Sequence, residues 1–74
     1  MKSLFEIPEG KEVLVAELSS HPEVCERLRE MGFCENARVK CISNSGTMLI
    51  CQVCNSRLGI NESLAKQIFV LSLN

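Results

Sequence analysis

Apolar and polar residues along the chain alternate in short runs, and this pattern predicts several strands separated by turns. In "KEVLVAEL" (11–18), apolar side chains occupy both faces, which indicates a largely buried strand. In "ARVKCI" (37–42), small or apolar residues alternate with basic ones, which is typical of a half-buried strand. "SNSG" (43–46) is a turn signal before "TMLICQVC" (47–54). These segments therefore predict an antiparallel hairpin.

The C-terminal part of the sequence predicts two further strands. Asn55 and Ser56 indicate a tight reversal, because Asn tolerates positive φ better than other non-glycine residues, and "RLGI" (57–60) then returns as a strand. Asn61 caps one helical turn, and "IFVLSL" (68–73) is the last strand. About five short strands in so small a chain predict a closed or partly closed β-barrel.

One helix is predicted after the first strand, in "SSHPEVCERLREMGF" (19–33). Ser20 with Glu23 fits a capping box at its start. Pro22 suits the first helical turn, where its missing N–H costs little. The helix therefore has a marked beginning.

The end of this helix is marked as well. Gly32 suits the left-handed position just after a helix, and Phe33 should then contact Leu28 in the last turn. Val24, Leu28 and Met31 form one apolar stripe at helical spacing. The stripe is most simply explained as core, covering one open side of the barrel.

Size and composition indicate one folded domain, residues 1–74, because 46% of the residues are hydrophobic and 23% are charged. The net charge of −1 gives no global attraction for nucleic acid or an anionic membrane, and three Phe without Tyr or Trp offer few platforms for stacking bases. No apolar run is long enough to span a membrane, and the N-terminus is too short and too acidic for a signal peptide. We expect a cytoplasmic protein that binds no nucleic acid.

The five cysteines are an odd number at irregular spacing, which favours reduced thiols that mostly pack in the core. Cys51 and Cys54 have the C-x-x-C spacing of a zinc or redox pair, but residues three apart on a regular strand point to opposite faces. His21 is the only histidine, and one histidine does not make a metal site. These three residues are therefore weak metal-ligand candidates, and we assign no metal site to them.

Catalysis is not expected, because the chain has no Asp, one His and scattered Glu, and a small barrel has little interior left once its core is filled. The alternative is a binding surface. Arg27, Leu28, Met31 and Phe33 combine a cation with large apolar side chains at the helix end, which is the composition expected of interface anchors. We therefore take these four residues as candidate partner contacts.

Several short motifs occur in an order that resembles the FeoA family, ferrous iron transport protein A, over nearly the whole chain. They are Leu4, Pro8-x-Gly10, Val15, "RLREMGF", "SGTMLI" and Ala65-x-x-Ile68-x-Val70. The resemblance implies an SH3-like β-barrel of about five antiparallel strands with a helix inserted after the first strand. It also implies a cytoplasmic partner of FeoB, the membrane iron(II) transporter with a guanine-nucleotide-binding domain.

Two positions depart from the family pattern: Asn36 and Asn55 stand where the family usually has glycine. Both fit the fold, because Asn is the commonest non-glycine residue in the left-handed region. The leading functional hypothesis is a non-catalytic accessory protein that docks on FeoB. The alternative is a module that binds Fe²⁺ or Zn²⁺ and thereby changes its partner affinity or forms a weak homodimer. Related barrels also occur as appended domains of metal-dependent repressors.

Overall fold

The computed structural model describes residues 1–73 and contains six strands, two α-helices and one 3-10 turn. In chain order the elements are β1 (Lys2–Ser3), η1 (Leu4–Glu6), β2 (Glu12–Leu18), α1 (Pro22–Glu30), β3 (Arg38–Asn44), β4 (Met48–Val53), β5 (Ser56–Asn61), α2 (Glu62–Ala65) and β6 (Ile68–Ser72). The expected mostly-β fold is confirmed. The strand that the sequence did not predict is β1, so the helix α1 follows the second strand rather than the first.

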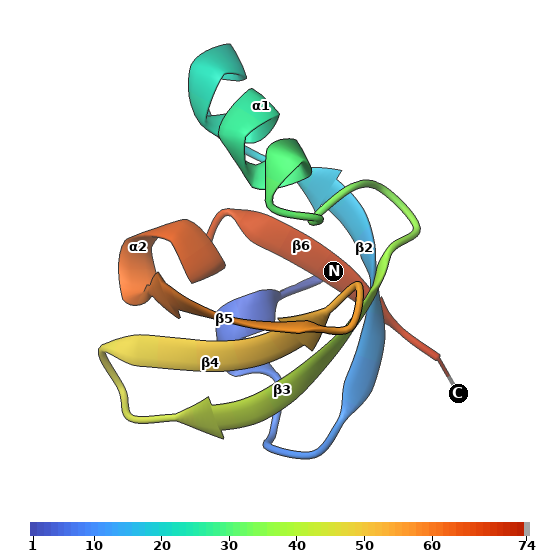
Figure 1. The fold of residues 1–74 in the computed structure, drawn as a ribbon, viewed down its shortest axis with the longest axis vertical. Coiled ribbons are helices and arrows are strands. Elements are labelled where there is room, and N and C mark those ends of the chain that lie inside the picture. Colours follow the sequence, from blue (N-terminus) through green and yellow to red (C-terminus); the bar gives the residue numbers. More distant parts are fainter. Residues whose placement is uncertain (74) are drawn as a thin grey trace.

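All strand pairs are antiparallel, and the sheet has the order β1-β6-β2-β3-β4-β5 (Figure 1). The register shifts between Val15 and Glu17 in β2 and between Cys41 and Ser43 in β3. Such bulges bend strands and increase their twist, which lets one sheet curl around a core. Among the described residues β5 does not pair with β1, so the barrel is partly open rather than closed.

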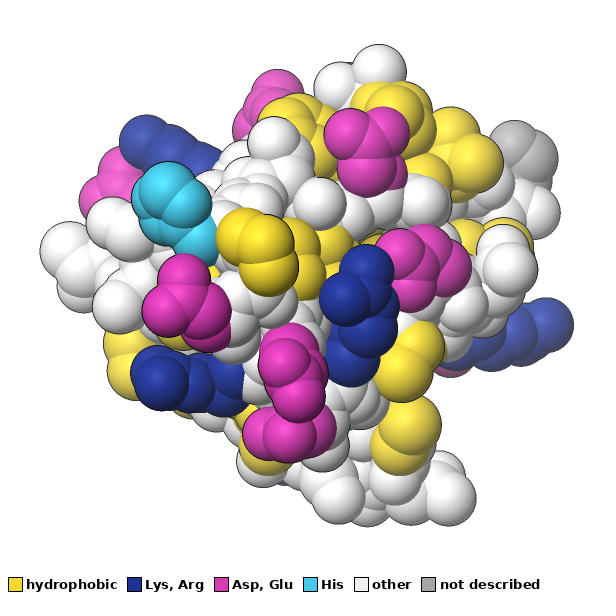
Figure 2. Space-filling model, turned by 90° about the horizontal axis from the view of Figure 1, so that it is seen from above, with side chains coloured by type: hydrophobic (Ala, Val, Ile, Leu, Met, Phe, Trp, Pro, Cys, Tyr) yellow, Lys and Arg dark blue, Asp and Glu magenta, His cyan; other side chains and the backbone are white. Residues whose placement is uncertain are grey.

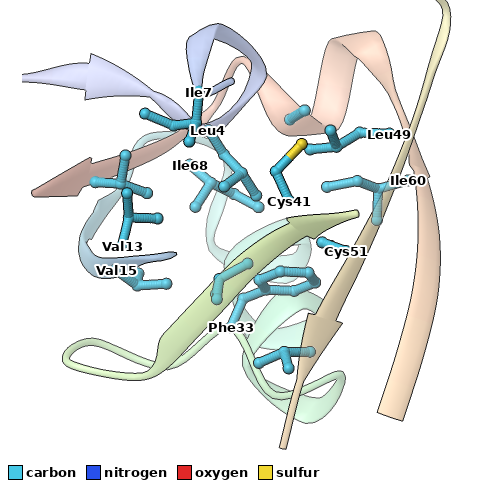
Figure 3. Packing of buried hydrophobic residues seen from close by; sticks show 14 of the residues in the cluster. Leu4, Ile7, Val13, Val15, Phe33, Cys41, Leu49, Cys51, Ile60 and Ile68 are labelled. Carbon is cyan, nitrogen blue, oxygen red and sulfur yellow. The ribbon is translucent and has the colours of Figure 1, made fainter. Parts of the chain in front are cut away.

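The core follows from the alternation of side chains along the strands. In β4, Leu49, Cys51 and Val53 point inward and are at most 1% exposed. Figure 3 shows Leu49 and Cys51 among the core side chains of the neighbouring strands, with Phe33 reaching in from the segment after α1. Because Phe33 is fully buried, the α1–β3 connection is anchored in the same core as the sheet.

Two tight reversals use asparagine in the left-handed region, as the sequence predicted. Asn36 has φ 72° and Asn55 has φ 64°, while Cys54 before it has φ 52°. A two-residue hairpin loop with positive φ at both positions matches the twist of the flanking strands. The β4–β5 turn is therefore Cys54–Asn55, one residue earlier than expected.

The start of α1 corrects one expectation. His21 is the N-cap residue, and its carbonyl accepts from the backbone N–H groups of Val24 and Cys25 at 3.0 Å. The expected capping box from Ser20 is not formed, because Pro22 already occupies the first helical position and places the cap at residue 21. The helix itself projects from one end of the sheet (Figure 1).

Candidate partner-binding surface

The four residues predicted as partner contacts separate into two groups. Leu28 is 1% exposed and Phe33 is 0% exposed, so both belong to the core. Arg27 is exposed and Met31 is half-buried, so both reach the surface. Arg27 and Met31 therefore remain candidate partner contacts. Leu28 and Phe33 are core residues and are not accessible to a partner.

The helix stop that presents these side chains has the predicted geometry. The N–H of Phe33 donates to the carbonyl of Leu28 at 2.9 Å, and the N–H of Gly32 donates to that of Arg29 at 3.0 Å. Gly32 has φ 109°. This is the Schellman arrangement, which satisfies carbonyls that a helix end otherwise leaves unpaired. The joint is fixed by backbone hydrogen bonds as well as by the buried phenylalanine.

An ion pair holds the outer side of the same joint. Arg29 Nη2 lies 3.1 Å from Glu35 Oε2, and Arg29 Nε donates to Glu35 Oε1 at 3.4 Å. Hydrogen bonding between the two side chains raises the pKa of Arg29 and lowers the pKa of Glu35. Each side chain is about half exposed, so solvent screens the pair and its contribution to stability is small.

The β4–β5 turn packs against this joint. A Cβ placed on Gly32 would lie 3.4 Å from Cys54 Sγ and 3.4 Å from a methyl group of Val53. Cys34 donates its thiol to the Arg29 carbonyl at 3.5 Å and is exposed. We call the surface formed by Arg27, Met31, Gly32, Cys34 and Cys54 the helix-end surface. It combines residues 27–34 with the β4–β5 turn.

A cleft of about 340 Å³ continues from the helix-end surface through Cys54. Its lining residues are Glu12, Ala37, Arg38, Lys40, Gln52, Cys54 and Asn55. Arg38 and Glu12 form an exposed pair at 3.8 Å, which leaves the Lys40 ammonium as the further charge of the cleft. The sequence signal for this cleft is the alternation of Arg38 and Lys40 with small or apolar residues along β3.

Charges of both signs cover this end of the molecule. Figure 2 shows acidic and basic side chains interspersed, with separate hydrophobic patches between them. A mixed surface of this kind does not favour a polyanion such as nucleic acid over a protein partner. It provides the polar rim that commonly surrounds the apolar contacts of a protein interface.

The weak metal candidates do not come together. His21 is exposed at the start of α1, Cys54 is exposed in the β4–β5 turn, and Cys51 is fully buried in the core. Burial raises the pKa of Cys51 to about 11, so this thiol stays protonated at neutral pH and is a poor metal ligand. Within residues 1–73, no group of three or more His, Cys, Asp or Glu side chains is placed to hold a metal ion.

A family comparison assigns the chain. The FeoA domain profile matches residues 2–71, which is nearly the full sequence. The chain belongs to the FeoA family. This family is associated with ferrous iron transport. No curated protein matches the chain.

Solved structures place this FeoA domain among SH3-like proteins. A crystal structure of an iron uptake regulatory protein (FeoA) has a TM-score of 0.88 at 24% identity, covering 97% of this chain and 96% of that one. FeoA of Stenotrophomonas maltophilia, solved with zinc and described as an SH3 domain protein, has a TM-score of 0.85 at 26% identity, covering 96% and 91%.

The same fold occurs within a larger regulator. A manganese-dependent transcriptional repressor has a TM-score of 0.89 at 18% identity, and the match covers 97% of this chain but 36% of that protein. At this identity the likeness concerns the fold alone. In the FeoA domain itself, no helix of the described residues is long and apolar enough to cross a membrane.

Proposed function

We propose that this FeoA domain is a non-catalytic accessory protein of ferrous iron transport that docks, in the cytoplasm, on the cytoplasmic part of a FeoB-type transporter. The observation that carries the proposal is the helix-end surface, where Arg27 and Met31 are accessible on a joint fixed by core packing and backbone hydrogen bonds. A rigid surface of this kind loses little conformational entropy when a partner covers it. Family membership supplies the link to iron transport.

Arginine and methionine are both enriched at protein interfaces. Met31 adapts its shape to a partner because its side chain is unbranched and polarisable. Arg27 is exposed on the preceding helical turn, and the carbonyl of Arg27 accepts from the Met31 N–H at 3.1 Å. The two side chains therefore lie on one side of the helix, where a single partner reaches both.

The interface must be wider than the helix end. A specific interface covers roughly 800 Å² on each partner. The described residues expose 4487 Å² in total, so such an interface would cover just under a fifth of the surface. The cleft beside Cys54 is contiguous with the helix-end surface, and we include its cations Arg38 and Lys40 in the docking area. Because Arg38 is paired with Glu12, Lys40 is the charge in this cleft that favours an acidic region on the transporter.

The experiment is a binding titration of the purified chain against the FeoB cytoplasmic domain, with GDP, with a non-hydrolysable GTP analogue and without nucleotide. Arg27→Glu should weaken binding roughly tenfold, because an anchoring arginine is replaced by the opposite charge. Arg57→Glu is the matched control, since Arg57 is also exposed but lies on β5. Absence of binding in all nucleotide states, or an equal loss for both variants, contradicts the proposal.

A second candidate function is a metal-responsive module that takes up Fe²⁺ or Zn²⁺ and changes its partner affinity or forms a weak homodimer. The zinc complex of the Stenotrophomonas maltophilia relative favours this candidate, as do the two exposed thiols of Cys34 and Cys54. Anaerobic titration with each metal, followed by sedimentation velocity, tests it. Stoichiometric uptake that is lost in the Cys34→Ser/Cys54→Ser variant supports the candidate, and no uptake together with an unchanged sedimentation coefficient contradicts it.

A further inference from the structure

A second hollow of about 450 Å³ lies at the opposite end of β2 from α1. Its lining residues are Met1, Lys2, Ile7, Pro8, Lys11, Val13, Val70, Leu71 and Ser72. We call this hollow the lysine groove. Its volume falls in the range of roughly 300 to 1,000 Å³ that is typical of ligand pockets.

The floor and one wall of the lysine groove are apolar. Ile7, Val13 and Val70 are buried below it, whereas Leu71 is 51% exposed and Met1 is 71% exposed. The exposure of Leu71 follows from the alternation of side chains along β6, because the preceding Val70 points into the core. Large apolar side chains are thus left partly in contact with water, which is the condition for binding an apolar group.

The charge of the lysine groove is positive. Lys2 and Lys11 line it, no carboxylate does, and neither lysine takes part in a salt bridge among the described residues. Their ammonium groups therefore remain available to a carboxylate that enters the groove. The pKa of Glu6 is lowered mainly by the hydrogen bonds from Ser3, and the nearby charge of Lys2 makes a smaller contribution.

The glutamates in the neighbouring segment are engaged with other partners. Glu6 accepts from the backbone N–H of Ser3 at 3.0 Å and from its hydroxyl at 3.1 Å. Glu9 accepts from the backbone N–H of Asn44 at 3.1 Å. Glu12 forms its ion pair with Arg38, in the other cleft. Among the described residues, none of these carboxylates forms an ion pair with Lys2 or Lys11.

We propose that the lysine groove binds an extended acidic segment of a partner protein, with a large apolar side chain on the groove floor and flanking carboxylates on Lys2 and Lys11. Charge complementarity selects acidic flanks, and the exposed Leu71 selects an apolar centre. A short peptide fits the concave shape better than a membrane does.

The lysine groove is separate from the helix-end surface. The groove adjoins the beginning of β2, whereas α1 follows the end of β2. The proposal therefore does not depend on docking to FeoB. Binding at one site and failure at the other are distinguishable, because no residue is shared between the two.

The test is fluorescence polarisation with a fluorescein-labelled decapeptide in which Leu-Phe is flanked on each side by four Glu. The wild-type chain should bind it saturably, and Lys2→Glu/Lys11→Glu should weaken binding roughly 5- to 30-fold, from the loss of two exposed ion pairs. Arg57→Glu is the matched control, because Arg57 is exposed on β5 and lines neither the groove nor the cleft, and this variant should bind as the wild type does. Circular dichroism establishes that each variant is folded.

Two altered peptides separate the contributions of charge and apolar contact. Replacing Leu-Phe with Ser-Ser, or every Glu with Lys, should abolish saturable binding, and Leu71→Ser in the chain should weaken binding of the original peptide. The proposal is overturned if saturation is not reached below about 1 mM, or if the double lysine variant binds as well as Arg57→Glu. It is also overturned if the chain ignores the peptide but cosediments with vesicles of equal parts phosphatidylserine and phosphatidylcholine, which would assign the groove to a membrane.

Discussion

Replacing Phe33 with alanine should remove a large part of the stability of the domain. Phe33 is fully buried and its backbone N–H closes the helix stop, so its ring joins α1 to the sheet core (Figure 3). Truncation leaves the backbone hydrogen bond intact and empties the space that the ring filled. The loss of free energy therefore reports the packing contribution of this single side chain.

The magnitude follows from burial. A buried phenylalanine removes roughly 150 to 250 Å² from water, and about 25 cal/mol per Å² gives roughly 4 to 6 kcal/mol. Measured Phe→Ala substitutions in protein cores cost about 3 to 5 kcal/mol. A domain of 74 residues has a free energy of unfolding of roughly 4 to 11 kcal/mol. Phe33→Ala should therefore remove at least about a quarter of it.

Urea denaturation followed by circular dichroism measures the effect, with the slope of free energy against urea compared between variants to detect any change in compactness. Met48→Ala is the control, because Met48 is 43% exposed on β4, and it should change the free energy of unfolding by about 0.5 kcal/mol or less. A loss below about 1 kcal/mol for Phe33→Ala would refute the reasoning that this ring anchors the joint.

Three further outcomes are expected. Gly32→Ala should cost roughly 1 to 2 kcal/mol in urea denaturation, because φ 109° is strained for a residue with a Cβ, and a loss near zero would mean that the joint rearranges. Ellman's reagent should react rapidly with Cys34 and Cys54 alone among the five thiols of the native chain, and rapid reaction of a third would show that the core opens. The pKa of Glu6 lies below its ordinary value near 4.5, chiefly because its carboxylate accepts from the Ser3 N–H. The stabilising contribution of Glu6 is therefore present above pH 4.5 and is lost as the pH falls through its folded-state pKa. Glu6→Gln should flatten this loss of stability in acid. An unchanged dependence of stability on pH would contradict the role given to Glu6.

The features that the sequence predicted correctly are determined by neighbouring residues. The helix stop at Gly32 and Phe33 depends on a residue without a Cβ followed by an apolar side chain, and both signals are local. The reversals at Asn36 and Asn55 likewise follow from the tolerance of asparagine for positive φ. Asn61 was predicted to cap the short helix α2, and its side chain accepts from the Leu64 N–H at 2.8 Å.

The features that were missed depend on residues far apart in the chain. β1 is only two residues long and pairs with β6 at the other end of the sequence, so no periodicity marks it. The lysine groove is lined by residues from both ends of the sequence, so only the tertiary structure reveals it.

The sequence predicted only part of the candidate site, because the rest depends on contacts between distant residues. The apolar stripe on α1 gave no means of deciding which of its members face the core. The structure decides this by placing Phe33 under the helix end, which buries Leu28 and leaves Met31 at the edge. The hairpin turn at Cys54 reaches the same surface only after the sheet has folded. Local patterns located the joint, and long-range packing determined which side chains are available there.

The central claim is that the helix-end surface docks on the transporter, and isothermal titration calorimetry with the FeoB cytoplasmic domain tests it most directly. Met31→Gln and Met48→Gln make the same chemical change at two surface methionines, one at the helix end and one on β4. Met31→Gln should weaken binding roughly tenfold while Met48→Gln leaves it unchanged. Equal affinity for the two variants, with both folded, would contradict the account.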